Sequence, residues 1–405
     1  MSYHIDMEDA AANEPVLLSK HSKNLLRFLH LLPARMASHD NTRSTIVFFA
    51  VCGLDVLNAL HLIPPQMRQD IINWIYGGLV VPRSNEKQCG GFMGCRAMVP
   101  QTDDAELQEC VRAYQWGHLA MTYTSVAVLA TLGDDLTRLD RKNIVAGVAA
   151  VQRPDGSFSA CIDGSESDMR FVYCAATICH MLDYWGDVNK ETMYQFIMRS
   201  LRYDYGFSQE LEGEAHGGTT FCALAALELS GQLHRLDTCT VERLKRWLIF
   251  RQVDGFQGRP NKPVDTCYSF WIGASLRILN AFELTDYAKN REYIMTTQDK
   301  LVGGFAKWPQ STPDPFHTYL GLCGLAFTGE PGLSDVMPSL NISMAAYAHL
   351  KQLHESWRLK GDENTTGASP YSIATTPELL DAAMEQQMKM CDDSETSTSP
   401  LISAQ

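Results

Sequence analysis

Apolar residues recur along this chain in runs of helical length, and each run follows a short turn that contains glycine and phenylalanine. Five such turns occur, and the last four place their phenylalanines at intervals of 49 residues: Phe158, Phe207, Phe256 and Phe305. The aromatic residues near the start of the apolar runs keep intervals of 48 to 50 residues: Tyr123, Tyr173, Phe221, Phe270 and Tyr319. A period in the forties with two helices per unit is typical of helical solenoids and closed helical barrels. The pattern therefore predicts an all-α fold in which each helical hairpin covers the apolar face of the next.

The same pattern predicts where the helices lie. Residues 21–32 and 44–60 carry apolar side chains at helical spacing. Five further inner helices are expected after His118, Arg170, Gly218, Asp265 and His317, and outer helices at 143–152, 190–203, 241–252 and 287–297. We therefore expect the chain to have three parts: a flexible acidic lead at 1–18, a barrel at 19–356 and a low-complexity tail at 357–405. The tail is expected to be disordered, although 376–390 could form a short helix.

Composition narrows the class of protein. A hydrophobic content of 45% over 405 residues is enough for a large core, and no apolar run approaches the roughly 18 residues of a membrane span. The formal charge of −13 argues against nucleic acid or an anionic membrane surface as the main partner, because both bind basic surfaces. The twelve cysteines are scattered without a C-x-x-C pair, which fits a reducing compartment. We expect no signal peptide, no lipidation motif and no stable membrane insertion, so the predicted location is the cytoplasm.

Three residues at the starts of two successive inner helices form a candidate zinc site. Asp265, Cys267 and His317 supply a carboxylate, a thiolate and an imidazole, which are ligand types that zinc accepts. Three protein ligands leave a fourth position open, as catalytic zinc sites do. An Asp-x-Cys pair and a single histidine could also be packed or capping residues. The repeat favours the metal, because it places Cys267 and His317 at equivalent positions of neighbouring hairpins.

Cationic and hydrogen-bonding residues flank the candidate zinc ligands. His216 precedes two glycines, Arg259 and Lys262 lie on one loop, and Tyr268 follows Cys267. Each of them alone could be a turn, surface or core residue. Together, beside an open zinc position, they favour an anionic leaving group such as diphosphate, because they could stabilise the charge that develops on it.

Three segments carry a resemblance to a known family: HGGTTF at 216–221, GRPNKPVDTCYSFW at 258–271 and GGFAKW at 303–308. Through them the sequence resembles the β subunits of protein prenyltransferases, most closely those of the type I geranylgeranyl branch. The resemblance implies an α-α barrel of about six helical hairpins around an apolar funnel, with one zinc ion per β subunit on the three candidate ligands. It also implies diphosphate contacts from four residues: His216, Arg259, Lys262 and Tyr268.

The activity that the resemblance implies is transfer of a C20 geranylgeranyl group from geranylgeranyl diphosphate to the cysteine of a C-terminal CaaX motif, typically with Leu or Phe last. Zinc would hold the substrate cysteine as a thiolate, since a free thiol with a pKa near 8.5 is mostly protonated at neutral pH. The expected partners are an obligate α subunit in a heterodimer and CaaX proteins such as small GTPases.

Further residues are assigned to peptide and lipid by the resemblance alone. Three are expected to bind the terminal carboxylate of the peptide through a water: His118, Glu166 and Arg170. The pocket for the last peptide side chain is expected around Thr45, His118, Ala120 and Phe171, and Phe49 is expected to line the lipid funnel. Glu166 and Arg170 could instead be only a surface ion pair.

Two positions indicate the branch of the family. Thr45 stands where the farnesyl enzyme has a tryptophan, so it leaves room for a fourth isoprene unit. Lys307 stands where the farnesyl enzyme has a magnesium-binding aspartate, and its ammonium group could meet the leaving diphosphate directly. Magnesium is therefore not expected to be required.

Alternatives stay open at this point. Farnesyl and Rab-type geranylgeranyl enzymes share the zinc site, so zinc does not distinguish them. A terpene cyclase with the same barrel would need an acid motif such as D-x-D-D, which the best candidates, Asp103-Asp104 and Asp134-Asp135, do not form. A non-catalytic helical scaffold would share the repeat but bind no zinc.

Overall fold

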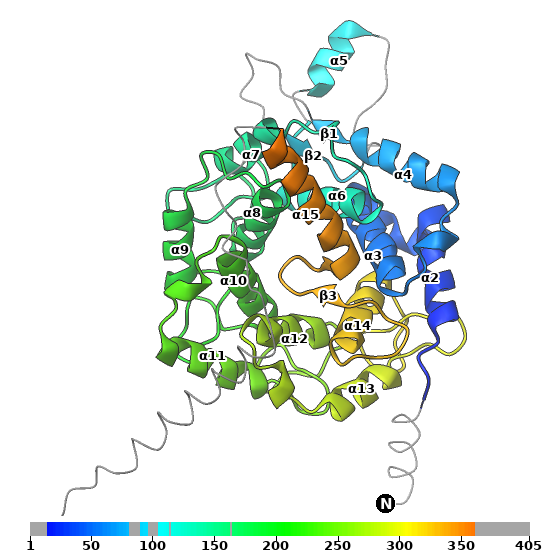
Figure 1. Ribbon diagram of the computed structural model, residues 1–405, viewed down its shortest axis with the longest axis vertical. Helices are drawn as coiled ribbons and strands as arrows, with labels where there is room; N and C mark the ends of the chain where they lie inside the picture. The colour runs from blue at the N-terminus through cyan, green and yellow to red at the C-terminus, as the bar shows by residue number, and fades with distance from the viewer. Residues whose placement is uncertain (1–13, 81–89, 96–103, 113–114, 163, 361–405) are drawn as a thin grey trace, which may run out of the picture. The chain divides into compact units, whose positions relative to one another are not determined.

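The inner helices of the chain form a closed ring (Figure 1). The computed structural model describes residues 14–80, 90–95, 104–112, 115–162 and 164–360, all within one unit of the chain, Met1–Thr366. The inner helices are α3 (Arg43–Val56), α6 (Leu119–Thr131), α8 (Met169–Met181), α10 (Gly217–Leu229), α12 (Tyr268–Ile278) and α14 (Pro315–Phe327). Each packs against the next, and α14 packs against α3. The predicted α-α barrel of six hairpins is confirmed.

The outer helices surround this ring in Figure 1. They are α2 (Leu18–His30), α4 (Pro65–Tyr76), α7 (Arg141–Ala150), α9 (Lys190–Arg199), α11 (Thr238–Ile249) and α13 (Tyr287–Thr296). The helices predicted at 143–152, 190–203 and 241–252 end earlier than expected. The reason is that the chain leaves each helix to pair with the following turn, through the bridges Gln152–Phe158, Leu201–Phe207 and Gln252–Phe256.

The repeated aromatic residues occupy two kinds of position. The turn phenylalanines Phe92, Phe158, Phe207, Phe256 and Phe305 are all fully buried, and each such burial stabilises the fold by about 1.5–3 kcal/mol. The aromatic residues near the helix starts meet inside the ring, where Tyr173 lies 5.5 Å from Tyr123 and 5.1 Å from Phe221 between ring centroids. Phe221 in turn lies 5.1 Å from Phe270, and Phe48 contacts both Tyr123 and Tyr319 at 5.5 Å. We call these six residues the aromatic belt.

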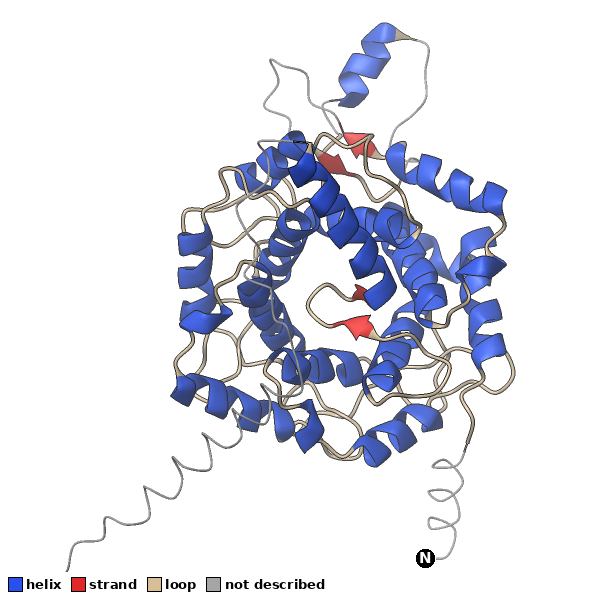
Figure 2. Ribbon diagram, viewed as in Figure 1, coloured by secondary structure: helices blue, strands red, loops and turns tan. Residues whose placement is uncertain are grey.

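Other elements cover the end of the ring at which the inner helices have their C-termini (Figure 2). Helix α15 (Met344–Leu359) and the antiparallel strands β3 (Val336–Met337) and β4 (Ile342–Ser343) lie across it, with Val336 opposite Ser343. The segment between the strands reaches the belt, because the Tyr319 hydroxyl donates to the carbonyl of Asn341 at 2.7 Å. The remaining elements are β1 (Leu79–Val80), paired with β2 (Gly91–Phe92), α5 (Ala105–Arg112) and the 3-10 turns Ala34–Thr42, Leu60–Leu62, Leu233–Arg235 and Phe282–Leu284.

The first hairpin is joined to the last by a contact that we call the seam. On α2, His21 Nδ1 accepts a hydrogen bond from the Gly304 N–H at 2.7 Å, so the ring proton sits on Nε2 and is donated to Gln298 Oε1 at 2.9 Å. The imidazole stacks on Phe305 with centroids 4.6 Å apart, and burial lowers the pKa of His21 to about 4. Gly304 has a φ of +92°, a conformation that favours glycine. A neutral, buried histidine thus closes the ring between the ends of the repeat.

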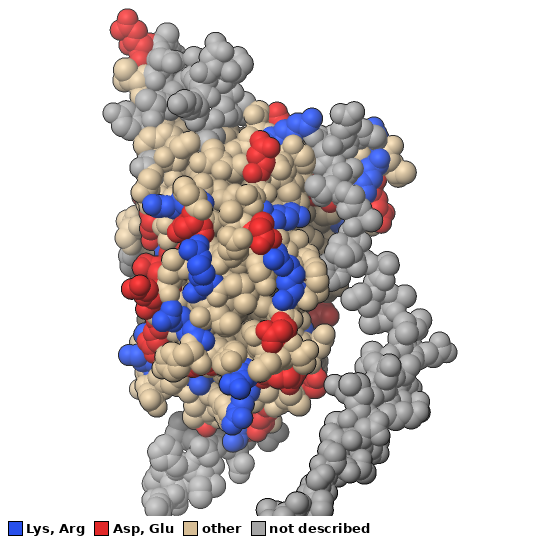
Figure 3. Space-filling model, turned by 90° about the vertical axis from the view of Figure 1, so that its left-hand side faces the viewer, with Lys and Arg blue, Asp and Glu red and all other residues tan. Residues whose placement is uncertain are grey.

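The surface over the outer helices carries charges of both signs. On the face that Figure 3 shows, Lys and Arg side chains are interspersed with Asp and Glu. Charges of opposite sign are also paired in the described part of the chain; Arg235 Nη1, for example, lies 2.7 Å from Glu191 Oε2. In the described part of the chain, no helix is both long and apolar enough to cross a membrane.

The predicted domain limits stay predictions. In the described residues, α2 begins at Leu18 and α15 continues to Leu359, so helix extends slightly past the predicted end of the barrel. The possible helix at 376–390 lies outside the described residues.

Candidate active site and metal centre

Four inner helices, α6, α8, α10 and α14, begin with a side chain that caps them, and Asp265 stands at the equivalent place just before α12; we call this the cap position. The cap position stands five residues before the aromatic-belt residue of the same inner helix. Its occupants are His118, Asp168, His216, Asp265 and Asp314. Each side chain accepts a hydrogen bond from a backbone N–H two or three residues further on, which satisfies an otherwise unpaired donor at the helix start. The ring therefore sets five polar side chains around the edge where its helices begin.

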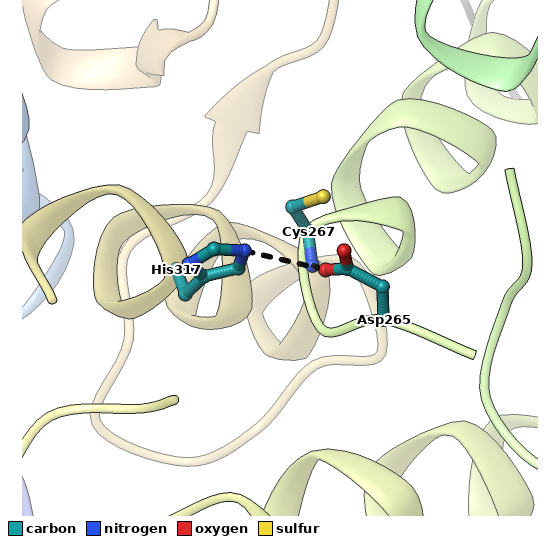
Figure 4. A group of neighbouring side chains, drawn as sticks. All are labelled: Asp265, Cys267 and His317. Atoms are coloured by element: carbon teal, nitrogen blue, oxygen red, sulfur yellow. Dashed lines mark hydrogen bonds and ion pairs between the residues drawn. The ribbon is translucent and has the colours of Figure 1, made fainter. Parts of the chain in front are cut away.

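At this edge the structure brings Asp265, Cys267 and His317 together (Figure 4). One ligand atom from each lies within 4.8 Å of the others. His317 Nε2 is 3.4 Å from Asp265 Oδ1, and two such atoms bound to one tetrahedral zinc ion would lie about 3.3 Å apart. The three side chains thus fit a zinc ion with little movement.

The electrostatics of these groups also suit a cation. Burial raises the pKa of the Cys267 thiol well above its usual value, and the Asp265 carboxylate raises it further. Burial alone would lower the pKa of His317, but hydrogen bonds to Asp265 and Asp314 outweigh it and raise the pKa to about 9. The pKa of Asp265 is lowered, because its hydrogen bonds with His317 and Cys267 outweigh its burial. The site therefore stabilises positive charge.

Asp314 orients His317. The Nδ1–H of His317 donates to Asp314 Oδ2 at 2.6 Å, which leaves Nε2 directed at Asp265. A carboxylate on the far nitrogen is the usual support of a metal-binding histidine.

Backbone contacts between neighbouring repeats place Lys307 beside the metal site. The N–H of Thr266 donates to the carbonyl of Lys307 at 3.2 Å, and the Thr266 hydroxyl donates to the carbonyl of Ala306 at 2.7 Å. As a result, Lys307 Nζ lies 3.6 Å from Asp265 Oδ2 although the lysine side chain is 44% exposed. Its ammonium group can therefore face both the metal site and solvent.

His216 and Tyr268 form a hydrogen-bonded pair on the adjacent repeat. His216 Nδ1 accepts from the Gly218 N–H at 3.0 Å, so we assign the ring proton to Nε2, which donates to the Tyr268 hydroxyl at 2.8 Å. Burial lowers the pKa of His216, and Arg259 lowers it further, which supports the neutral ring. The Tyr268 hydroxyl hydrogen is then available to an acceptor in the site. Gly258 allows this packing, since a Cβ there would lie 2.2 Å from the tyrosine ring.

The other two expected diphosphate residues lie on the loop before α12. Arg259 Nη1 donates to Glu214 Oε2 at 2.6 Å, with the arginine side chain 36% exposed. Lys262 is exposed three residues further along the same loop.

The expected peptide-binding residues form a second cluster along the same edge. The His118 ring lies 5.9 Å from that of Phe171, and the Arg170 guanidinium lies 5.3 Å from the centre of the Phe171 ring. Arg170 pairs with Glu166 at 2.9 Å and with the buried Asp168 at 2.6 Å. Ala120 is half-buried in the first turn of α6, where its N–H donates to His118.

The two expected lipid residues share one cavity. Thr45 and Phe49 on α3 line a space of about 740 Å³, together with Phe28, His39, Phe316 and others. The Phe49 and Phe316 rings lie 5.4 Å apart, and Phe316 adjoins the metal-site residue His317. The cavity therefore extends from Thr45 to Asp314 and Phe316, which are neighbours of the metal-site residue His317.

Comparison with known proteins decides the family. Residues 16–342 match the family model described as the prenyltransferase alpha-alpha toroid domain. The geranylgeranyl transferase type-1 subunit beta of Dictyostelium discoideum is 36% identical over 341 residues, 81% of this chain and 95% of the relative. The corresponding Arabidopsis thaliana subunit is 34% identical over 81% of this chain and 89% of the relative. The chain belongs to the family of type-1 geranylgeranyl transferase β subunits.

A solved structure agrees with this family. Candida albicans protein geranylgeranyltransferase-I complexed with GGPP aligns with a TM-score of 0.73 at 29% identity, over 84% of this chain and 99% of the matched chain. The resemblance to prenyltransferase β subunits, and to their type I geranylgeranyl branch, is confirmed.

The sequence alone did not lead us to three residues of the site: Asp168, Asp314 and Glu214. Asp168 and Asp314 support Arg170 and His317, and the repeat could have found both, because each stands five residues before a repeated tyrosine. Glu214 had no such signal, since its pairing with Arg259 depends on loop conformation.

The aspartates that we considered as a possible cyclase motif make hydrogen bonds within the fold, where the structure describes them. Asp134 accepts from the Leu136 N–H and the Tyr76 hydroxyl, and Asp135 accepts from Thr137. Asp104 accepts from backbone N–H groups at the start of α5, and Asp103 lies outside the described residues.

Proposed function

We propose that this chain is the catalytic β subunit of a zinc-dependent enzyme that transfers a geranylgeranyl group from geranylgeranyl diphosphate to the cysteine of C-terminal CaaX motifs. The observation that carries the proposal is the group Asp265, Cys267 and His317, whose ligand atoms lie within 4.8 Å of one another at the edge of an aromatic-lined ring. The family of the chain supplies the lipid and the type of reaction.

The metal-site residues would each have a defined task. Zinc held by Asp265, Cys267 and His317 would keep the substrate cysteine as a thiolate at neutral pH. Asp314 would hold the His317 ring so that Nε2 faces the metal. The sulfur–carbon bond then forms at C1 of the lipid while the C1–O bond breaks, and diphosphate leaves with the bonding electrons. No side-chain base is required, because the thiol has already lost its proton.

The cationic edge would receive the leaving diphosphate. The Tyr268 hydroxyl, held by His216, would donate a hydrogen bond to a phosphate oxygen, and Arg259 and Lys262 would pair with its charge. Lys307 would meet the charge that grows as the C1–O bond breaks, since its ammonium lies beside the metal site. With that cation fixed in the protein, magnesium would not be required.

The second cluster would select the peptide. His118, Glu166 and Arg170 would bind the terminal carboxylate through a water, with Asp168 positioning Arg170. The pocket for the last side chain would lie around Thr45, His118, Ala120 and Phe171, and Phe49 would line the lipid funnel. In this proposal the active form is a heterodimer with a prenyltransferase α subunit, its substrates include small GTPases, and it works in the cytoplasm.

The experiment that tests the proposal is a competition assay on the purified heterodimer loaded with zinc. Geranylgeranyl and farnesyl diphosphate are supplied at equal concentration with peptides ending in CaaL, CaaS or SaaL. We expect transfer of the C20 group to the CaaL peptide and none to SaaL, which lacks the cysteine. Cys267→Ala should abolish transfer, whereas Cys222→Ala, which removes a buried thiol from α10, should not. A preference for the farnesyl donor would instead support the farnesyl alternative, and absence of transfer would support a non-catalytic scaffold.

A further inference from the structure

The guanidinium of Arg259 already has an anionic partner. Its Nη1 donates to Glu214 Oε2 at 2.6 Å, and the two side chains are 36% and 57% exposed. The pair lies immediately beside His216 and Tyr268, where the proposed function puts the diphosphate.

The backbone fixes the position of Glu214 opposite Arg259. Glu214 is two residues before His216, whose N–H donates to the carbonyl of Phe207 at 3.1 Å. The next N–H, that of Gly217, donates to the carbonyl of Gly258 at 2.8 Å. The loop that carries Glu214 is therefore hydrogen-bonded to the residue that precedes Arg259, and the carboxylate has a set place in the site.

We propose that Glu214 is the exchange partner of diphosphate on Arg259: it pairs with the guanidinium when no diphosphate is bound and competes with the product diphosphate for it. This inference rests on the proposed function, since Arg259 meets diphosphate only in such a reaction. Glu214 acts through Arg259 and is a positioning residue.

The chemistry of the two anions supports the exchange. Carboxylate and phosphate oxygens both match the planar donors of arginine, so either can take the place of the other. Glu214 accepts from Nη1, one of the nitrogens that carry the five guanidinium hydrogens. Pairs as exposed as this one are weak, worth no more than about fivefold in an equilibrium constant, so a multiply charged diphosphate can displace the carboxylate. The carboxylate can then return to the guanidinium as diphosphate leaves, and this competition for Arg259 favours release of the product.

The sign of one measurement separates this role from simple support of Arg259. If Glu214 only oriented the guanidinium, its loss would weaken the binding of diphosphate. If Glu214 competes, its loss would strengthen that binding, because an opposing negative charge is removed while Arg259 keeps its own.

The test is a titration of inorganic diphosphate against a fluorescent geranylgeranyl diphosphate analogue on the zinc-loaded heterodimer. Glu214→Gln keeps the size of the side chain, and we expect it to lower the Kd of diphosphate about two- to fivefold. Glu212→Gln is the matched control, because Glu212 is an exposed carboxylate on the same loop, and it should leave the Kd unchanged. In an Arg259→Ala background the effect of Glu214→Gln should disappear, as a double-mutant cycle requires for residues that act through each other.

Two results would overturn the inference while the wild-type protein still binds the lipid and transfers it. One is a Kd for Glu214→Gln that is unchanged or higher, and the other is an equal tightening in the absence of Arg259. Failure of the wild-type protein to bind either the lipid or diphosphate would instead refute the proposed function.

Discussion

Binding of zinc should release two protons from this protein at pH 7.5. The His317 ring has a pKa raised to about 9 by Asp265 and Asp314 against the effect of burial, so it is almost fully protonated at that pH. The Cys267 thiol has a pKa raised well above its usual value by burial and by Asp265, so it is protonated too. Zinc binds neutral imidazole and thiolate, and both protons must therefore leave.

The free-energy cost of displacing a proton depends on how far the pH lies below the pKa of the group. Displacing the proton of His317 at pH 7.5 costs about 2 kcal/mol, at about 1.36 kcal/mol per pH unit. Because the folded-state pKa of His317 is raised, this cost grows as the pH falls and disappears above about pH 9. With two protons displaced, the zinc association constant should rise about a hundredfold for each pH unit between pH 6 and 8.

Isothermal titration calorimetry in two buffers of different ionisation enthalpy measures the protons released. Cys267→Ala should release no more than one, and Cys222→Ala, which alters another buried thiol, should still release two. Release of one proton or fewer by the wild-type protein would refute the reasoning, because at least one of the two ligands would then be deprotonated before zinc binds.

Three other predictions test separate parts of the site. Cys267→Ala and His317→Ala should each lose bound zinc and activity but keep much of the affinity for the lipid diphosphate, because the proposed function assigns that ligand to the funnel and the cationic edge. Full zinc occupancy of both variants, measured by atomic absorption, would contradict the proposed zinc ligands. Thr45→Trp should favour the farnesyl donor, because the indole would fill the space that we expect to hold the five extra carbons of the longer lipid. Burial of those carbons is worth up to about 4 kcal/mol. An unchanged ratio of kcat/KM for the two donors would exclude Thr45 as the determinant of lipid length. Removal of magnesium with zinc retained should change kcat less than about threefold, or about 0.7 kcal/mol. Lys307→Asp should be slow without magnesium and recover with millimolar Mg²⁺, whereas a wild-type need for millimolar magnesium would contradict the role of Lys307.

The spacing of the aromatic turns was sufficient to predict the ring, because residues one period apart take equivalent places in neighbouring hairpins. It also predicted that Cys267 and His317 lie close together although they are 50 positions apart in the sequence. The ends of the helices could not be predicted from apolar periodicity, since they depend on the pairing of residues such as Gln152 and Gln252 with the following turns.

The cap position could have been found from the repeat, because it stands five residues before a repeated aromatic residue. Residue type alone does not mark it, since histidine occupies it in some hairpins and aspartate in others, as at His118 and Asp168. The pairing of Arg259 with Glu214 was also beyond prediction, because it joins two irregular loops whose path the period does not determine.

The seam connects the beginning of the chain to the segment that carries Lys307. An open array of repeats has two end units that can loosen first, whereas a closed ring has none until the contact between its first and last hairpins breaks. Here that contact is made at Gly304 and Phe305, and the same short segment continues directly to Ala306 and Lys307. Helix α2 therefore supports the metal edge from outside the ring, while Thr266 holds the same segment through the carbonyls of Ala306 and Lys307. Loosening of His21 from Gly304 would remove one of these two supports of Lys307.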